Sequence, residues 1–178
     1  TSGSTGTPKG VAVTHGGLKN VLLAMREEIG LSGDDRLMAI TTVGFDISAL
    51  ELFVPLISGA SVIIAETEIV RDPPALARSI DKTGTTILQA TPTLWHALTM
   101  SGAEGLQDLT VLVGGEALTG ELSSALRGLG GQVRNLYGPT ETTVWSAVML
   151  LGDDDASETP PIGRPIWNTR VYVLDDCL

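Results

Sequence analysis

The first ten residues, Thr1–Gly10, combine groups that could hold a polyphosphate. They read Thr-Ser-Gly-Ser-Thr-Gly-Thr-Pro-Lys-Gly, so hydroxyls, glycines and one lysine share a short loop. Gly3 and Gly6 can adopt positive φ angles and let the backbone approach a ligand closely, and Lys9 supplies a mobile positive charge. Backbone N–H groups, hydroxyls and a cation that converge in this way are typical of anion-binding loops.

This loop has two other interpretations. The Walker phosphate loop needs glycine directly before its lysine and Ser or Thr directly after it, whereas Pro8 and Gly10 flank Lys9 here. A flexible Gly/Ser linker is the simpler alternative, but a lysine that follows Thr-Pro does not suit a spacer. We therefore expect a phosphate-binding loop of another kind.

A second polar segment, Asn135–Thr143, reads Asn-Leu-Tyr-Gly-Pro-Thr-Glu-Thr-Thr and lies where an expected strand leads into an expected helix. Ligands of α/β sheets lie beyond the carboxyl ends of the strands, and Thr140 with free amides can bind phosphate there. The carboxylate of Glu141 could simply interact with the helix dipole, which contributes about 0.3 to 1 kcal/mol. A separate phosphate loop also needs a cation, and Glu141 is the best candidate to hold Mg²⁺.

Several motifs together resemble one enzyme superfamily. The loop Thr1–Gly10 resembles the phosphate-binding core motif of adenylate-forming enzymes, which include nonribosomal peptide synthetase adenylation domains, acyl-CoA synthetases and luciferases. The segment Asn135–Thr143 is similar to their Tyr-Gly-x-Thr-Glu signature. Phe45-Asp-Ile-Ser48 resembles the form found in amino-acid-activating domains, and Gly163-Arg-Pro165 followed by Val171–Asp175 fits the next stretch. The resemblance covers essentially the whole chain.

Asp46 separates the branches of this superfamily. It lies between Phe45 and Ile47 in an apolar region, where a buried carboxylate must be paired. Ser48 and Glu51 predict a capping box for the following helix, which leaves Asp46 free for another task. The resemblance implies that Asp46 binds the α-ammonium of an amino acid, a group that the substrates of acyl-CoA synthetases lack.

The resemblance also implies which residues line the substrate side-chain pocket. They are Asp46, Ile47, Leu50, Gln89, Leu112, Gly114, Leu136, Val144 and Trp145. Most are large and leave little room, a lining similar to the pattern associated with glycine activation. Gly114 is expected to open one wall, which keeps alanine as an alternative. All but Gln89 would also suit an ordinary hydrophobic core.

The resemblance implies that an amino-acid carboxylate attacks the α-phosphate of ATP, that pyrophosphate leaves, and that the aminoacyl group passes to the phosphopantetheine thiol of a carrier protein. Lys9, Thr140 and Glu141 are the expected catalytic residues, with Glu141 as the Mg²⁺ ligand. The expected ATP-binding residues are Thr1, Ser2, Gly3, Ser4, Thr5, Gly6, Thr7, Lys9, Gly114, Gly115, Glu116, Asn135, Tyr137, Gly138 and Thr140. Carrier and condensation domains in the same polypeptide are the expected partners.

Two alternatives remain open. Acyl-CoA synthetase-like carboxylic acid activation would suit the two phosphate motifs equally well. A non-enzymatic nucleotide-binding module is the other alternative. The chain has no initiator methionine and opens inside a motif, so residues 1–178 are expected to be a fragment of the adenylation domain. The family's ribose-binding aspartate and small C-terminal domain would then lie beyond residue 178, and the chain alone would be nearly inactive.

Alternating strands and helices must position these residues. The pattern predicts strands at 11–13, 36–42, 61–65, 85–88, 109–113, 132–136 and 170–174, and helices at 16–28, 49–57, 74–82, 93–100, 121–127 and one entered at Pro139. Short strands spaced by helices predict an α/β fold with layered, largely parallel sheets and packed helices. The resemblance assigns it to the large N-terminal domain of an adenylate-forming enzyme.

Composition excludes several classes of function. The 178 residues are 43% hydrophobic and 18% charged, as in one globular domain. The net charge of −10 and the scattered Lys and Arg residues argue against a nucleic-acid or anionic lipid surface. No apolar stretch approaches the roughly 20 residues of a membrane span. Cys177 is the single cysteine, which fits a reducing, cytoplasmic location.

Overall fold

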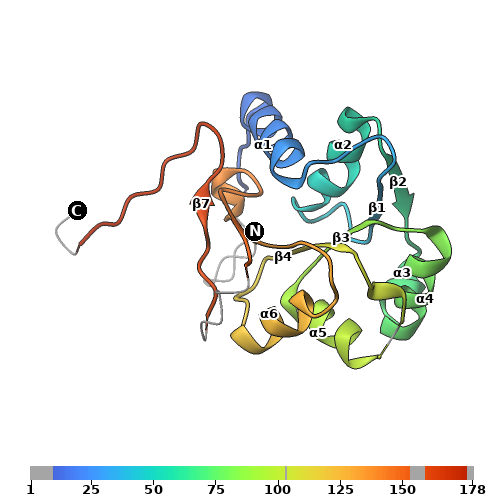
Figure 1. The fold of residues 1–178 in the computed structure, drawn as a ribbon. Coiled ribbons are helices and arrows are strands. Elements are labelled where there is room, and N and C mark those ends of the chain that lie inside the picture. The colour runs from blue at the N-terminus through green and yellow to red at the C-terminus, as the bar shows by residue number, and fades with distance from the viewer. Residues whose placement is uncertain (1–9, 103, 153–158, 176–178) are drawn as a thin grey trace.

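The computed structural model describes residues 10–102, 104–152 and 159–175. Its centre is a seven-stranded sheet with the order β2-β1-β3-β4-β5-β6-β7 (Figure 1). The strands are β1 (Arg36–Ala39), β2 (Ser61–Ile64), β3 (Ile87–Ala90), β4 (Thr110–Gly114), β5 (Val133–Tyr137), β6 (Ala147–Leu150) and β7 (Arg164–Pro165). The first five strands run parallel, and β6 and β7 are antiparallel to their neighbours. The predicted α/β fold with a largely parallel sheet is confirmed.

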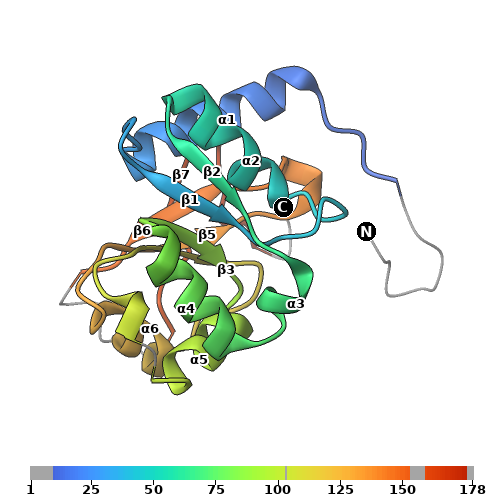
Figure 2. The same ribbon diagram turned by 90° about the vertical axis from the view of Figure 1, so that its right-hand side faces the viewer.

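Helices cover both faces of the sheet (Figures 1 and 2). The helices are α1 (His15–Ile29), α2 (Ser48–Ser58), α3 (Thr67–Val70), α4 (Pro73–Thr83), α5 (Pro92–Met100) and α6 (Gly120–Arg127), with 3-10 turns η1 (Glu104–Leu106) and η2 (Thr140–Thr142). α1 and α2 lie on one face, and α4, α5 and α6 lie on the other. Successive strand residues therefore enter different cores: Leu112 packs with α1 and α2, whereas Val111 and Val113 pack with α4 to α6.

Local sequence signals explain where the helices begin and end. Thr14 caps α1 by accepting a hydrogen bond from the Gly17 amide at 3.0 Å. Thr91 caps α5 in the same way, and Pro92 occupies the first helical turn, where its missing N–H costs nothing. α2 ends at Gly59, whose φ of 74° suits glycine.

Four local predictions were wrong. Residues 11–13 form no strand: Val11 is half-buried, and the side chains of Ala12 and Val13 are exposed. The segment entered at Pro139 is a single 3-10 turn, η2, because Thr143 turns left-handed with φ 70°. Residues 170–174 extend from the body without strand pairing (Figure 1). The Ser48/Glu51 capping box does not form, since α2 begins after Ile47 without a side-chain cap and Ser48 Oγ donates to the Phe45 carbonyl.

Candidate active site

The carboxyl ends of β1, β3, β4 and β5 meet at one edge of the sheet. The strand order reverses between β1 and β3, because β2 lies on one side of β1 and β3 to β5 lie on the other. Open α/β sheets bind ligands outside the carboxyl ends of their strands at such a switch point. Among the predicted site residues, Gly115 and Glu116 follow β4 and Gly138 and Thr140 follow β5 at this edge. Leu50 lies on α2, and Trp145 precedes β6.

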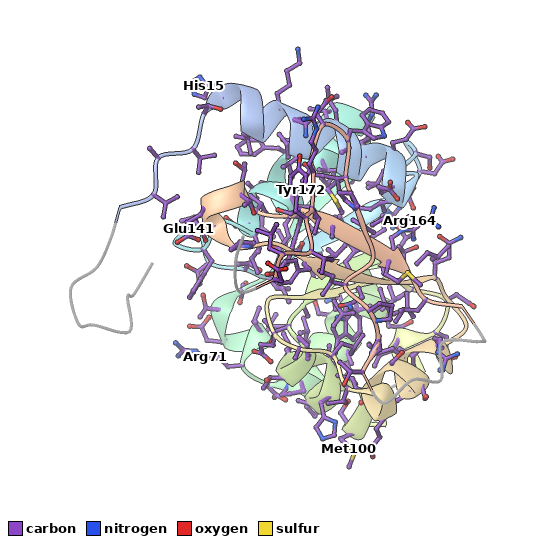
Figure 3. All side chains as sticks on the ribbon, turned by 90° about the vertical axis from the view of Figure 1, so that its left-hand side faces the viewer. His15, Arg71, Met100, Glu141, Arg164 and Tyr172 are labelled. Atoms are coloured by element: carbon purple, nitrogen blue, oxygen red, sulfur yellow. The ribbon has the colours of Figure 1, made fainter. Side chains whose placement is uncertain are left out.

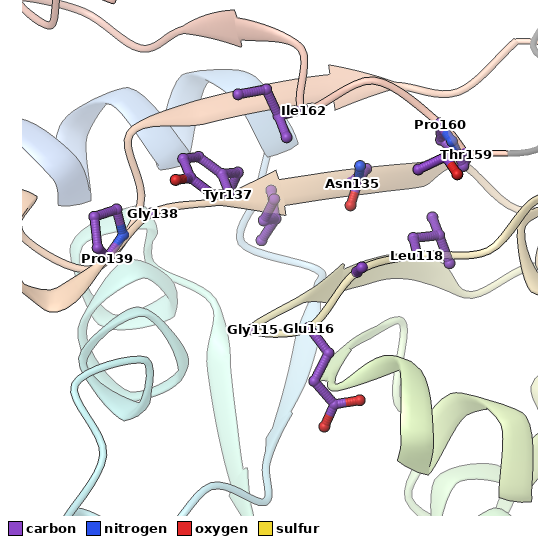
Figure 4. A pocket seen from close by; sticks show the side chains of 12 residues that line it. Gly115, Glu116, Leu118, Asn135, Tyr137, Gly138, Pro139, Thr159, Pro160 and Ile162 are labelled. Carbon is purple, nitrogen blue, oxygen red and sulfur yellow. The ribbon is translucent and has the colours of Figure 1, made fainter. Parts of the chain in front are cut away.

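A cavity of about 370 Å³, called here the β5 cavity, opens beside this edge (Figure 4). Its lining residues come from three stretches of chain: Gly115, Glu116, Ala117 and Leu118; Asn135, Leu136, Tyr137, Gly138 and Pro139; and Thr159, Pro160 and Ile162. Tyr137 is 48% exposed, so its ring is available to a ligand. The structure thus brings five residues of the predicted nucleotide site to one cavity: Gly115, Glu116, Asn135, Tyr137 and Gly138. The lining does not include Gly114 or Thr140, and it does include Ile162, which the sequence prediction did not name.

Two polar side chains at the cavity already have protein partners. Asn135 Nδ2 donates to the Pro161 carbonyl at 2.9 Å, which ties β5 to the returning chain. The Glu116 carboxylate accepts hydrogen bonds from the Thr93 amide at 3.2 Å and the Thr93 hydroxyl at 2.6 Å. Figure 4 shows this side chain pointing away from the cavity. Glu116 can therefore serve a ligand in the cavity through its backbone, with the turn opened by Gly115 at φ 86°.

The Tyr-Gly-Pro-Thr-Glu turn is held tightly. The Ser146 amide donates to the Tyr137 carbonyl at 2.7 Å, and the Thr143 amide donates to the Thr140 carbonyl at 3.1 Å. Thr143 and Val144 adopt φ angles of 70° and 61°, a conformation that β-branched residues rarely take. Such backbone persists only where its surroundings enforce it, and it is common at functional sites. The turn therefore fixes where Thr140 and Glu141 leave the sheet edge.

Glu141 is exposed on this turn, on the side of the molecule where residues 10–14 lead into α1 (Figure 3). Among the residues that the structure describes, no three His, Cys, Asp or Glu side chains are grouped to hold a metal. A single carboxylate fits Mg²⁺ only where a substrate's phosphate oxygens and water complete its six ligands. The single carboxylate of Glu141 therefore fits a Mg²⁺ ion that binds together with a polyphosphate.

The predicted phosphate loop, with Thr1, Ser2, Gly3, Ser4, Thr5, Gly6, Thr7 and Lys9, lies outside the described residues. The chain that follows it can be placed. A Cβ atom added to Gly17 in the first turn of α1 would lie 3.1 Å from the Thr143 hydroxyl. The start of α1 therefore lies against the turn that carries Thr140 and Glu141.

Asp46 lies in the tight turn before α2. It is partly exposed and Phe45 beside it is 65% exposed, so the prediction of a buried apolar setting was wrong. The turn is closed by backbone hydrogen bonds from the Ser48 amide to the Phe45 carbonyl and from the Ala49 amide to the Asp46 carbonyl. A partly exposed carboxylate needs no internal partner and remains accessible to a cationic group.

Most of the remaining predicted pocket residues are packed against one another, although Leu136 also lines the β5 cavity. Five of them, called here the Trp145 cluster, are almost fully buried: Leu50, Gln89, Leu112, Leu136 and Trp145. Trp145, only 1% exposed, donates its indole N–H to Gln89 Oε1 at 3.1 Å. A Cβ atom on Gly114 would lie 2.7 Å from the Trp145 ring and 2.6 Å from the Leu136 carbonyl. The sequence predicted that Gly114 opens one wall of the side-chain pocket. That prediction was wrong, because the indole ring of Trp145 fills the space beside Gly114.

Glu51 is the buried group that the sequence prediction misread. It is fully buried, and its carboxylate accepts hydrogen bonds from the Ile40 and Thr41 amides, both at 2.9 Å, from the Thr41 hydroxyl, and from Gln89 Nε2 at 2.8 Å. Burial raises the pKa of the Glu51 carboxyl above its usual value, although these donors oppose the shift. One signal was available, since Glu51 lies on the same helix face as Val54 and Pro55, which are buried.

No helix among the described residues is both long and apolar enough to cross a bilayer.

Three comparisons relate this chain to known proteins. Residues 1–177 match the family model described as AMP-binding enzyme. A dimodular nonribosomal peptide synthase from Bacillus subtilis (strain 168) is 58% identical over 178 residues, which make up 100% of this chain and 7% of that protein. The chain thus spans a small part of the length of this curated relative.

Solved structures agree. The four-domain nonribosomal peptide synthetase holo-AB3403, bound to AMP and glycine, superposes with a TM-score of 0.87 at 40% identity, over 96% of this chain and 13% of that one. The Vibrio cholerae adenylation domain AlmE, in complex with glycyl-adenosine-5'-phosphate, superposes with a TM-score of 0.82 at 28% identity, over 93% of this chain and 32% of that one. The family resemblance predicted from the motifs is confirmed: this chain belongs to the AMP-binding enzymes, as part of an adenylation domain of the nonribosomal peptide synthetase kind.

Proposed function

We propose that the protein containing this chain activates an amino acid, with glycine as its preferred substrate, by transferring AMP from ATP to the amino-acid carboxylate. The observation that carries the proposal is the Trp145 cluster, in which a Cβ atom on Gly114 would lie 2.7 Å from the buried indole ring. On this proposal, the ring occupies the space into which a substrate side chain would extend. The glycine- and glycyl-adenylate-bound relatives support it.

The size of the substrate follows from burial. The side chains of Leu50, Leu112 and Trp145 are at most 1% exposed, so a substrate side chain that entered among them would have to displace protein atoms. Fitting one extra methyl group into such a site costs about 1 to 3 kcal/mol, or roughly 10- to 200-fold in kcat/KM. Glycine has no side chain to accommodate, and alanine would be discriminated against by that factor.

Asp46 supplies the complement to the substrate's ammonium group. Its carboxylate is partly exposed at the start of α2, while the next residue, Ile47, is held by a hydrogen bond from Gln89 Nε2 to its carbonyl at 3.1 Å. The turn that carries Asp46 is therefore fixed to β3 at the edge of the Trp145 cluster. A carboxylate beside a closely packed cluster selects an ammonium group and a small side chain together.

The nucleotide would occupy the β5 cavity, with its adenine against the Tyr137 ring and the backbone of Gly115 and Glu116. Thr140 would hold the α-phosphate, and Lys9 with the hydroxyls of residues 1–7 would hold the departing pyrophosphate. One carboxylate oxygen of the amino acid attacks the α-phosphorus, an O–P bond forms, and the bond to the β-phosphate oxygen breaks. The contribution of the protein is positioning and charge stabilisation.

Glu141 would hold Mg²⁺, whose positive charge offsets the charge of the phosphates. Carrier and condensation domains of the same polypeptide would be the partners, and the phosphopantetheine thiol of the carrier would accept the aminoacyl group. The multidomain nature of the relatives supports these partners.

The test is amino-acid-dependent exchange of labelled pyrophosphate into ATP by the full-length protein. We expect exchange with glycine and none with acetate, which has the carboxylate but no ammonium group. Asp46→Asn keeps the shape of the side chain and removes its charge, so glycine-dependent exchange should fall more than about 100-fold through loss of a charge-assisted contact. Exchange with acetate, or an unaffected Asp46→Asn variant, would contradict the proposal.

A further inference from the structure

A buried chain of hydrogen bonds connects α2 to the Trp145 ring. It runs from the Glu51 carboxylate to Gln89 on β3 and from Gln89 to the indole N–H of Trp145, with distances of 2.8 and 3.1 Å. Glu51, Gln89 and Trp145 are each at most 1% exposed, so water does not compete for these contacts. This series of hydrogen bonds lies where the strand order reverses between β1 and β3.

The neighbours of Gln89 allow its amide group only one orientation. Trp145 Nε1 can only donate, so it must face the amide oxygen. The Ile47 carbonyl can only accept, so it must face the amide nitrogen, and Glu51 Oε1 accepts from that same nitrogen. The orientation that satisfies all three partners is the one in the structure.

Glu51 is itself surrounded by donors. Oε2 accepts from the Ile40 and Thr41 amides, and Oε1 accepts from the Thr41 hydroxyl and from Gln89. The two backbone amides cannot be reversed, so Oε2 must remain an acceptor. If the side chain at position 51 carried a hydrogen-bond donor, that donor could therefore face only Thr41 or Gln89. A donor that faced Gln89 would force the Gln89 amide group to reverse its orientation.

We propose that Glu51 is a positioning residue for substrate size: its carboxylate fixes the orientation of the Gln89 amide and thereby holds the Trp145 ring across the side-chain pocket. The inference rests on the proposed function and extends it to a residue that does not line the pocket. Reversal of the Gln89 amide would set its NH₂ group against the indole N–H. A buried donor without an acceptor is costly, so the ring would shift and admit a larger side chain.

The experiment measures the glycine-to-alanine ratio of kcat/KM in pyrophosphate exchange by the full-length protein. Glu51→Gln keeps the size of the side chain and adds one donor, and we expect the ratio to fall about tenfold. Trp145→Phe removes the indole N–H. In that background Glu51→Gln should change the ratio by less than about twofold, because no donor is left to be opposed.

Thr41→Val is the matched control. It removes one hydrogen bond from the same carboxylate but leaves the Gln89 amide in place, so the ratio should stay within about twofold of the wild-type value. An equal fall with Glu51→Gln in the wild-type and Trp145→Phe backgrounds, or no fall in either, would overturn the proposal. If Glu51→Gln does not fold, Gln89→Met takes its place: it removes the acceptor of the indole N–H, and an unchanged ratio would again reject the inference.

Failure of the proposed function is recognised separately, in the wild-type protein. If the wild type prefers another amino acid, the same ratio is measured between that substrate and its homologue with one more methylene. If no amino acid supports exchange, the crystal structure of the Glu51→Gln full-length protein decides. A displaced Trp145 ring and a reversed Gln89 amide would support the positioning role, and an unchanged arrangement would reject it.

Discussion

The β5 cavity and the Trp145 cluster lie at the same edge of the sheet but differ in how they are filled. The cavity keeps about 370 Å³ of space beside an exposed tyrosine, whereas the cluster is closed by an indole ring against a glycine. The first region is suited to a large, flat ligand, and the second is suited to excluding side chains. One short segment connects the two regions, because Tyr137 begins the Tyr-Gly-Pro-Thr-Glu turn and Trp145 follows soon after it.

The largest expected effect on stability is in the closed region. Trp145→Ala removes a fully buried indole and its hydrogen bond to Gln89, and it should lower the free energy of unfolding by about 3 to 5 kcal/mol. Trp167→Ala is the matched control, because Trp167 is 48% exposed, and it should cost less than about 1 kcal/mol. Urea unfolding of both variants measures the difference, and equal losses would mean that the cluster is not tightly packed.

Gly114→Ala should also disturb the cluster, by a smaller amount. The new methyl group would meet the Trp145 ring at 2.7 Å and the Leu136 carbonyl at 2.6 Å, and such overpacking costs about 1 to 3 kcal/mol. Gly16→Ala places the same methyl group in ordinary van der Waals contact, 3.9 Å from the Thr14 hydroxyl, and should be neutral or stabilising within the helix. Thermal unfolding compares the two, and a neutral Gly114→Ala would show that the indole ring can move aside.

At the β5 cavity, a substitution should affect the binding of ATP and not the choice of amino acid. Tyr137→Ala removes a ring that lines the β5 cavity, and loss of a base–aromatic stack should raise the KM for ATP about tenfold. The glycine-to-alanine ratio should not change, because Tyr137 is outside the Trp145 cluster. Tyr172→Ala, at a tyrosine that is 66% exposed and does not line the cavity, should leave both quantities unchanged. A changed ratio in Tyr137→Ala would mean that the two regions are not separate.

The smallest expected effect is on the pH dependence of the free energy of unfolding, to which Glu51 and Asp35 should contribute with opposite signs. Burial raises the pKa of Glu51 above 4.5 despite its hydrogen bonds. Its contribution to stability is therefore fully present below pH 4.5 and is lost as the pH rises through the folded-state pKa. Burial also acts to raise the pKa of Asp35, but hydrogen bonds from Ser32 and Thr86 outweigh it and lower this pKa below 3.8. The Asp35 contribution is present above pH 3.8 and is lost as the pH falls through the lowered pKa.

Urea unfolding at a series of pH values tests this pair. The difference between the wild type and Glu51→Gln should decrease as the pH rises, and the difference between the wild type and Asp35→Asn should decrease as the pH falls. Slopes of the same sign would contradict the assignment.

Most of the fold was predictable from the sequence because its signals are local. Helical periodicity and end signals such as Thr91-Pro92 and Gly59 gave helix boundaries within one or two residues. The motifs gave the family, and the strand-end rule brought Tyr137 and Gly115 to one cavity. These features depend on neighbours along the chain or on the general geometry of parallel sheets.

The rest depends on partners distant in sequence. Residues 147–150 form β6 because they pair with β5, whereas the equally apolar residues 171–174 have no strand to pair with in the described part of the chain. Glu51 matches the capping-box pattern with Ser48, but donors at the end of β1 and on β3 capture its carboxylate instead. A local pattern cannot report such competition, and the same limit hid the contact between Trp145 and Gly114.

The measurement that tests the central claim most directly is pyrophosphate exchange by the full-length wild-type protein with amino acids of increasing size: glycine, alanine, 2-aminobutyrate and leucine. A closed Trp145 cluster predicts the highest kcat/KM with glycine, a fall of about 10- to 200-fold to alanine, and no detectable exchange with leucine. Comparable exchange with leucine or 2-aminobutyrate would contradict the account, because it would require space that the packed indole ring does not leave.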